Sequence, residues 1–414
     1  MIAYFAYLIL ALSLAAPLLV RVDGRYVAVA TSLALVALTA AAGVPVGVLV
    51  ALVALALALD WRVGSFGLAL SFAAVAAAIA VYVYYAAQPV VYGLIALALA
   101  TAAVYGLLAM GRGRENVEGA VKYLVFSGVG KVLIVVGYFA AVAGWPWGLY
   151  LAVLGFMFEL GVAPFHAWVV DAYALGSPGG AASLAAFSKV TALFVLLAIF
   201  KSLSLKAPGE VGLVALVVAL VSMLVANVAG LTAKTLGRVM AYSSIAHMSY
   251  ALAAVALVWW LGEPEKRPSL FGAPVSAADL AILVVVLEGL ASGLAKAGVF
   301  GYLRAAFSDL LPPRRSVLNV LNVLSLLGLP PLLGFWPKLL LALLILSYPN
   351  VQLAVLLVAW VVFNSALATP YYLRAVRWLM EAPGPVGDNV TSSYTAFAAV
   401  ALGVALPLVA YLLL

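Results

Sequence analysis

The stretch that decides the fold runs from Phe156 to Lys189 and reads FMFELGVAPFHAWVVDAYALGSPGGAASLAAFSK. Its first part predicts an apolar helix with one carboxylate, Glu159, and Pro164 interrupts that helix because proline has no backbone N–H to donate. A turn-rich segment then leads into a second apolar helix that carries one ammonium group, Lys189. Ionisable groups inside a bilayer cost about 2.5–3.5 kcal/mol each and therefore mark a pathway or a pair. A broken helix at membrane depth needs protein or a wet cavity around it, so the stretch predicts a site of transport.

The composition of the whole chain indicates an all-α polytopic membrane protein. Of its 414 residues, 68% are hydrophobic and 8% are charged, and apolar runs of about twenty residues recur along its length. The first apolar run lacks a basic start and a cleavage site, so we expect a helix there and no signal peptide. The absence of cysteine excludes disulfides, thiolate metal sites and cysteine-bound iron–sulfur clusters. The net charge of +7 is spread over short loops, which argues against a nucleic-acid partner.

The apolar runs predict about fourteen membrane helices, of which the third is short and the seventh and twelfth are broken. The predicted ranges are 2–20, 26–43, 44–59, 65–86, 89–111, 118–143, 147–169, 182–203, 211–231, 238–261, 278–305, 316–346, 351–379 and 393–414.

The distribution of basic residues predicts that both termini lie outside the cell. With this orientation twelve basic residues fall in inside loops and four in outside loops, and the other five of the 21 lie within helices. Inside loops of membrane proteins carry the excess of lysine and arginine. The inside set is Arg21, Arg25, Arg62, Arg112, Arg114, Lys234, Arg238, Arg304, Arg314, Arg315, Arg374 and Arg377, and the outside set is Lys201, Lys206, Lys266 and Arg267.

Two short sequence motifs each occur twice, and the two copies are separated by nearly the same number of residues. SGVGK at 127–131 matches SGLAK at 292–296, and LGVAP at 160–164 matches LGLPP at 327–331, with offsets of 165 and 167. The repeating unit is five helices, and because five is odd the second copy must be inverted in the membrane. We therefore expect one membrane domain with N-terminal helices at 1–64, repeats at 65–205 and 206–380, and a C-terminal helix at 381–414.

Seven ionisable residues inside the predicted helices are candidates for a proton relay. Three lie near the middle of their helices, two share one face of the eleventh helix with Ser292, and one lies beyond the second helix break, towards the outer surface. The histidine suits proton transfer because imidazole titrates near neutral pH. The alternative is a set of static salt bridges that hold helices together. The candidates are Lys131, Glu159, Lys189, Glu288, Lys296, Lys338 and His247.

The sixth and seventh helices are joined by only about four residues, so they should be antiparallel neighbours. Lys131 and Glu159 then lie at equal depth, and we expect them to pair. His166, next to the break, is either a proton-transfer group or a polar residue that satisfies free backbone; a haem held by both histidines is the least favoured interpretation. Trp168, Tyr173 and the pair at 145 and 147 are expected to be anchors at the membrane surface.

Seven segments resemble, in order, the antiporter-like subunits of respiratory complex I, and most closely the N- and M-type subunits of NADH-quinone oxidoreductase. The same family includes Mrp cation/proton antiporters and membrane-bound hydrogenase subunits. The segments are VEGAVKY, APFHAWVVDAY, AAFSK, GRVMAYSSIAHMSY, GLAKAGVF, LSLLGLPPLLGFWPK and YYLRAVR. The resemblance implies fourteen helices, inverted repeats, and one proton pathway driven by a redox module elsewhere in the complex.

The resemblance also implies roles for individual residues. Lys189 matches the lysine of helix 8, Lys296 a lysine of helix 11 found in some members, Lys338 the exit residue of helix 12, and His247 the family histidine. There are two departures. No acid occupies the fifth helix, and Glu159 stands where the family has a lysine.

Together these observations predict a proton-translocating membrane subunit of a complex I-like or hydrogenase-like assembly, without a cofactor of its own. We expect it in the cell membrane, in contact with lipid and with other membrane subunits, carrying protons, with Na⁺ as the alternative ion. The alternatives are a non-pumping scaffold subunit and an Mrp-type cation/proton antiporter.

Overall fold

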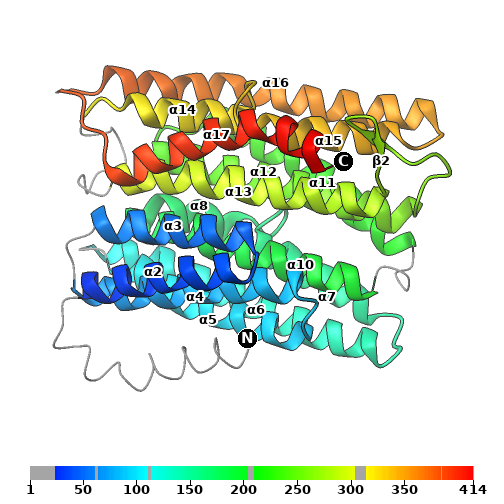
Figure 1. The fold of residues 1–414 in the computed structure, drawn as a ribbon, viewed down its shortest axis with the longest axis horizontal. Coiled ribbons are helices and arrows are strands. Elements are labelled where there is room, and N and C mark those ends of the chain that lie inside the picture. The colour runs from blue at the N-terminus through cyan, green and yellow to red at the C-terminus, as the bar shows by residue number, and fades with distance from the viewer. Residues whose placement is uncertain are drawn as a thin grey trace.

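Helices that run along one common axis make up the molecule (Figure 1). The computed structural model describes residues 24–60, 64–110, 113–203, 209–303, 314–383 and 385–413. The elements of the first half are α2 (Gly24–Ala41), α3 (Pro45–Asp60), α4 (Gly64–Tyr85), α5 (Val90–Ala109), α6 (Arg114–Val142), α7 (Gly148–Leu160), α8 (Ala167–Leu175), α9 (Pro178–Ser183), the π-helical turn η1 (Leu184–Ser188) and α10 (Lys189–Leu203). The second half contains α11 (Gly209–Leu231), α12 (Leu236–Leu261), β1 (Ser269–Leu270), β2 (Ala273–Pro274), α13 (Ala277–Leu303), α14 (Val317–Leu327), α15 (Phe335–Leu346), α16 (Val351–Glu381) and α17 (Val390–Leu413).

The described helices confirm the second to the fourteenth predicted spans. Ten helical stretches are long and apolar enough to cross a membrane, and the short helix α3 and the two broken helices supply the remaining spans. The first predicted span, 2–20, lies outside the described residues. One difference is that the eighth span begins at Pro178, four residues before the predicted start. The other is a two-stranded antiparallel hairpin, β1–β2, in a segment expected to be a loop.

Both predicted helix breaks are present. The first separates α7 from α8 and the second separates α14 from α15. Each break begins at a glycine with positive φ, Gly161 at 67° and Gly328 at 91°, a conformation that ends a helix and that glycine adopts without a steric penalty. Each also contains a cis peptide bond before a proline, at Pro164 and Pro331. The inverted relation between the two five-helix units remains a prediction.

Helices α6 and α7 pack with their backbones in direct contact. A Cβ atom on Gly137 would lie 2.3 Å from the backbone nitrogen of Ala152, and one on Gly155 would lie 2.5 Å from the carbonyl oxygen of Gly130. Small residues of this kind allow membrane helices to approach closely. The predicted antiparallel neighbours are therefore confirmed, and the glycines explain why they lie so near each other.

Hydrogen bonds between the ends of helices show that the loops form two groups, one at each end of the bundle. On one side Arg25 donates a hydrogen bond to the carbonyl of Leu59, and Asp60 accepts from the backbone N–H of Thr391 at the start of α17. On the other side Tyr150 donates to Glu210 at the start of α11. Each bond joins segments that were predicted to share a side.

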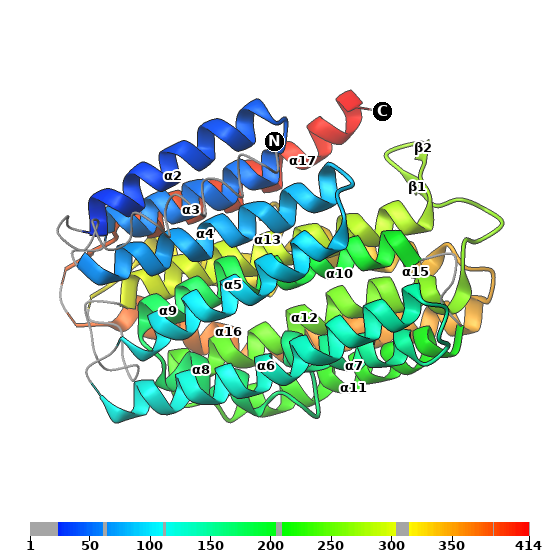
Figure 2. The same cartoon turned by 90° about the horizontal axis from the view of Figure 1, so that it is seen from below.

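The centre of the bundle is formed by α10, α12 and α13, whose side chains are almost all buried. Figure 2 shows α10 and α13 between α2, α3 and α17 on one side and α6, α7 and α11 on the other. By contrast α6 and α16 each expose an apolar face. The candidate residues of α10, α12 and α13 therefore lie far from the lipid-facing surface, and Lys131 of α6 lies close to it.

Candidate functional site

The first cluster of candidate residues is centred on Glu159. Its Oε2 atom lies 2.9 Å from Nζ of Lys131 and accepts a hydrogen bond of 2.6 Å from the hydroxyl of Ser127. The Lys131 ammonium group also donates to that hydroxyl, one helical turn away. The carboxylate of Glu159 is 1% exposed and the side chain of Lys131 is 14% exposed. The pair predicted from loop length and depth is therefore present, at the contact between α6 and α7.

Lys189 joins the same cluster from a different helix. Its Nζ atom donates a hydrogen bond of 2.8 Å to the backbone carbonyl of Glu159 and lies 4.4 Å from the centre of the Trp168 ring. The π-helical turn η1 ends directly before Lys189, whose N–H bonds to the carbonyl of Leu184 five residues back. Such turns are rare and often occur at functional sites. Two ammonium groups thus converge on one glutamate, and only Lys131 contacts its carboxylate.

The second cluster lies between α12 and α13. Nδ1 of His247 is 2.5 Å from Oε2 of Glu288, and both side chains are almost completely buried. Lys296, two turns further along α13, donates a hydrogen bond to the hydroxyl of Ser292, which lies one turn after Glu288. The expected common face of Glu288, Ser292 and Lys296 agrees with this arrangement, but the contact between His247 of α12 and Glu288 of α13 was not predicted.

Lys338 lies just beyond the second helix break, in α15, and its depth relative to the outer surface stays a prediction. Its Nζ atom donates to the carbonyls of Leu326 and Leu327 at the end of α14, at 3.2 and 2.7 Å. Side chains on a helix point towards its N-terminus. The ammonium group of Lys338, in the first turn of α15, therefore reaches back into the break. It also lies 5.8 Å from the ring centre of Tyr250.

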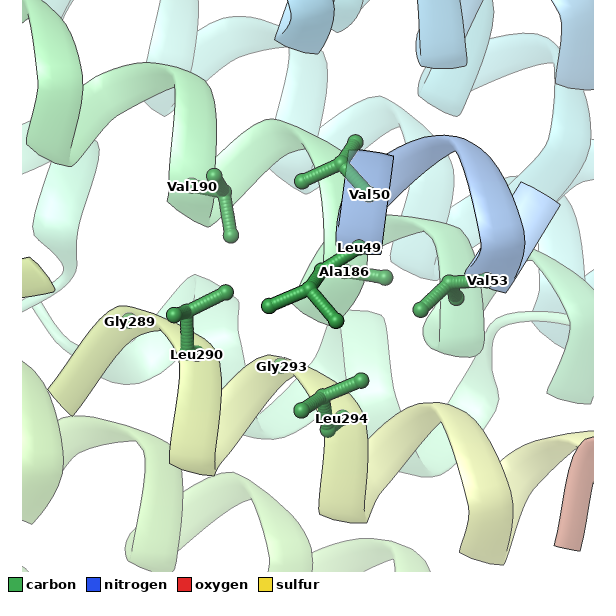
Figure 3. Close-up of a pocket in the computed structure, with 9 residues that line it drawn as sticks. All are labelled: Leu49, Val50, Val53, Ala186, Val190, Gly289, Leu290, Gly293 and Leu294. Carbon is green, nitrogen blue, oxygen red and sulfur yellow. The ribbon is translucent and has the colours of Figure 1, made fainter. Parts of the chain in front are cut away.

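A small apolar cavity lies where η1 and α10 meet α3 and α13. The cavity, of ≈ 10 Å³, lies beside Val190, the residue after Lys189, and beside Gly293 and Leu294 of α13 (Figure 3). Its walls are aliphatic side chains and glycines of α3, η1, α10 and α13. This volume is about one water probe, and an apolar wall offers a water molecule no hydrogen-bond partner. The cavity itself therefore offers no polar side chain that could carry a proton.

Two aromatic residues expected at the membrane surface are buried. Trp168 is 1% exposed and donates to the carbonyl of Phe158, and Tyr173 is 0% exposed. Both face the interior because α8 packs against α6 and α12. The predicted surface position holds for the other pair, Trp145 and Trp147, which are 56% and 41% exposed.

His166 stays apart from both clusters within the described part of the chain. It occupies the position before α8, and its buried Nδ1 atom has no hydrogen-bond partner among the described residues. The interpretation that this nitrogen satisfies free backbone is therefore not supported. No group of three or more His, Asp or Glu side chains converges as metal ligands anywhere in the described segments.

Several hydroxyl groups complete the first cluster and were not predicted. Thr101 of α5 contacts Ser127 at 3.3 Å, and Tyr123 of α6 contacts Ser188 of η1 at 2.9 Å. All four are buried. One signal was available for Ser127, because the repeated motif places a serine four residues before a lysine in both units, where one turn of helix brings them together.

Comparisons with known proteins find relatives of this chain. The family model described as NADH:quinone oxidoreductase/Mrp antiporter, transmembrane, matches residues 140–262. NADH-quinone oxidoreductase subunit N 2 of Acidobacterium capsulatum is 30% identical over 358 residues, which are 79% of this chain and 70% of the relative. The first four curated relatives are covered over 62% to 70% of their length.

Two solved structures share the fold. A chain of respiratory complex I from Thermus thermophilus superimposes with a TM-score of 0.75 at 24% identity, over 98% of this chain and 97% of that one. A chain of the Mrp complex from Dietzia sp. gives a TM-score of 0.72 at 17% identity, over 99% and 95% of the two chains.

Proposed function

The chain belongs to the family of NADH-quinone oxidoreductase subunit N, and from this premise we propose that it is a proton-translocating, antiporter-like subunit of a larger redox-driven membrane assembly. The related chains named above belong to multi-subunit membrane complexes, which supports other membrane subunits as partners. We place the complex in the cell membrane and its redox centres in those partners.

The observation that carries the proposal is a set of buried lysines without ion-pair partners along the middle of the bundle. Lys189 and Lys296 are 3% and 0% exposed, and neither forms an ion pair within the described residues. An opposite charge holds an ammonium group in its charged form. Lysines that lack an opposite charge are suited to take up and release protons. In a set of static salt bridges, each buried lysine would instead have an acidic partner.

The Lys131–Glu159 pair supplies a means of control. When the carboxylate of Glu159 is neutralised by Lys131, it attracts the neighbouring Lys189 ammonium group less. When the pair opens, the carboxylate becomes available to Lys189, which already bonds to the backbone of the same residue. Opening and closing of this pair would therefore change the protonation of Lys189. The lysine lies on α6 and the acid on α7, a polarity opposite to that of the family.

From the lysines the path leads across α13 to the second break. Glu288 and His247 form the buried pair next to Lys296, and the ammonium group of Lys338 reaches into the break. Among the described residues no hydrogen bond joins Lys189 to this second half, so transfer between the halves requires water to enter or side chains to move. We assign the relay to Lys131, Glu159, Lys189, His247, Glu288, Lys296 and Lys338.

The test compares two lysines of the same helix. In the complete complex reconstituted into vesicles, Lys189→Ala should lower proton translocation per electron transferred by a factor on the order of 100, the contribution of one positioned proton-transfer group. Lys201→Ala, at the exposed end of α10, serves as the matched control and should retain translocation. Undiminished translocation in the Lys189 variant, with the complex assembled, would contradict the proposal.

A non-pumping scaffold subunit is the second candidate function. The observation that favours it is the absence of any aspartate or glutamate in α5, where the family places a glutamate. If this candidate were correct, alanine variants of Lys189 and Lys296 would both assemble and pump normally. The same experiment therefore decides between the two functions.

A further inference from the structure

A tyrosine of α16 contacts the buried histidine from the side opposite its carboxylate partner. The hydroxyl of Tyr372 lies 3.3 Å from Nε2 of His247, whose Nδ1 faces Glu288 at 2.5 Å. The same hydroxyl donates a hydrogen bond of 2.8 Å to Oγ of Ser243, one turn before His247 on α12. All four side chains are at least 98% buried. Three helices thus contribute to one line of contacts, from Ser243 through Tyr372 and His247 to Glu288.

The hydrogens along this line can be assigned. A phenol has one hydrogen, and here it points to Ser243, so the oxygen of Tyr372 faces Nε2 of His247 as an acceptor. This contact is a hydrogen bond only in the ring states that carry a hydrogen on Nε2. On the other side of the ring, the hydrogen between Nδ1 and Glu288 is shared by two basic atoms. The partner of one ring nitrogen sets which hydrogen stays and which can move.

We propose that Tyr372 is a positioning residue that keeps one hydrogen on Nε2 of His247, so that the proton that moves is the one between Nδ1 and Glu288. In that step the Nδ1–H bond breaks and an O–H bond forms on Oε2 of Glu288. The imidazolium and carboxylate become a neutral imidazole and a carboxylic acid. No proton is gained or lost, and no charge remains unpaired in the buried site.

This step places the transferred proton on a residue of α13. Oε1 of Glu288 is buried and has no hydrogen-bond partner in the described part of the molecule. It lies on the helix that carries Ser292 one turn later and Lys296 two turns later. Directing the mobile proton to Glu288 therefore directs it to the α13 side of the relay, away from α16.

The charged groups around His247 do not compete with Tyr372 for Nε2. Glu288 and Lys296 of α13 and Lys338 of α15 act on the ring electrostatically, and the ring of Tyr250 lies 6.4 Å away on α12 itself. Among these residues, only Glu288 is bonded to a ring nitrogen. The state of Nε2 is therefore set by Tyr372, whereas the other groups act on the charge of the whole ring.

The inference rests on the proposed proton transfer, but its test observes His247 directly. The full chain is labelled with ¹⁵N-histidine and placed in lipid vesicles. It contains only two histidines, so the signals that remain in His166→Gln belong to His247. At one pH near neutrality, Nε2 of His247 should be protonated. In Tyr372→Phe the acceptor is lost, and a signal of unprotonated Nε2 should appear. The spectrum reports the protonation of His247 whether or not the complex pumps protons. A failure of the proposed function can therefore be told apart from a failure of this inference.

The adjacent tyrosine provides the matched control. Tyr371 donates its hydroxyl hydrogen to Asn227 of α11 and shows no bond to His247. Tyr371→Phe should therefore give the spectrum of the unmodified chain, although it too removes one tyrosine hydroxyl group from α16. A Tyr372→Phe spectrum identical to that of the unmodified chain would overturn the proposal, as would an equal change in both variants. Proton translocation by the complete complex should fall in Tyr372→Phe more than in Tyr371→Phe.

Discussion

At the scale of single residues, Glu159 connects the two lysines of the first half. Its carboxylate contacts Lys131 and its backbone carbonyl accepts a hydrogen bond from Lys189. The backbone contact holds Lys189 in place whether or not the carboxylate is neutralised. Because the carboxylate is buried, its effect on the stability of the fold depends on its partner. Removing one member of a buried ion pair destabilises a protein far more than removing both members together.

The corresponding prediction is a strong coupling between Lys131 and Glu159. Lys131→Ala or Glu159→Ala alone should destabilise the chain by about 3–5 kcal/mol, because each leaves an uncompensated charge. The double variant should lose much less than the sum of the two. The measurement is a double-mutant cycle on unfolding in detergent and on assembly of the complex. Additive losses would show that the two side chains do not depend on each other.

At the scale of elements, glycines decide how close the charges lie. Gly130 precedes Lys131, and Gly155 lies one turn before Glu159 on the facing helix. The backbones of α6 and α7 touch at these positions, so the two side chains meet with their ammonium and carboxylate groups 2.9 Å apart. A similar contact occurs at Gly293, where a Cβ atom would lie 3.2 Å from the carbonyl of Ala185 in η1.

We predict that Gly155→Ala separates α6 from α7. The new Cβ atom would lie 2.5 Å from the carbonyl oxygen of Gly130, a backbone atom that cannot move by itself. Overpacking of this kind costs about 1–3 kcal/mol, and the Lys131–Glu159 distance should increase with it. Thermal unfolding of the purified chain measures the effect.

Gly128→Ala is the control on α6, because a Cβ atom there meets nothing within 4 Å. Alanine is the better helix former, so this variant should be neutral or slightly stabilising. If Gly155→Ala unfolded at the same temperature as Gly128→Ala, the close approach of the two helices would not matter for stability.

At the scale of the whole molecule, the loops fall into two groups that define two membrane surfaces. The hydrogen bond from Tyr348 to the carbonyl of Gly262 joins the ends of α15 and α12 on one surface. The hydrogen bond from Arg374 to the carbonyl of Leu231 joins α16 to the end of α11 on the other. The second group coincides with the predicted inside loops, which carry the larger share of basic residues.

We predict that the group with fewer basic residues faces the outside, together with both termini. Because the chain has no cysteine, single cysteines can report on this directly. Glu265→Cys and Thr232→Cys place one thiol in an exposed loop of each group. An impermeant maleimide should label the first in intact cells and the second only after the membrane is opened. The reverse pattern would invert the orientation.

The sequence by itself determined the second to the fourteenth membrane span, both helix breaks and one ion pair. The reason is that these features depend on neighbours along the chain: apolar runs predict spans, glycine and proline predict breaks, and a short loop forces α6 beside α7. Lys131 and Glu159 could be paired because their separation along one hairpin fixes their relative depth.

Only the tertiary structure decided which distant side chains meet. His247 and Glu288 are 41 residues apart and His247 and Tyr372 are 125 apart, so their contacts depend on how three helices rotate and pack about one another. The same packing buries Trp168 and Tyr173, which the aromatic pattern placed at the surface. Lys338 reaches back into the break because a helical side chain points towards its N-terminus, a direction that hydropathy does not report.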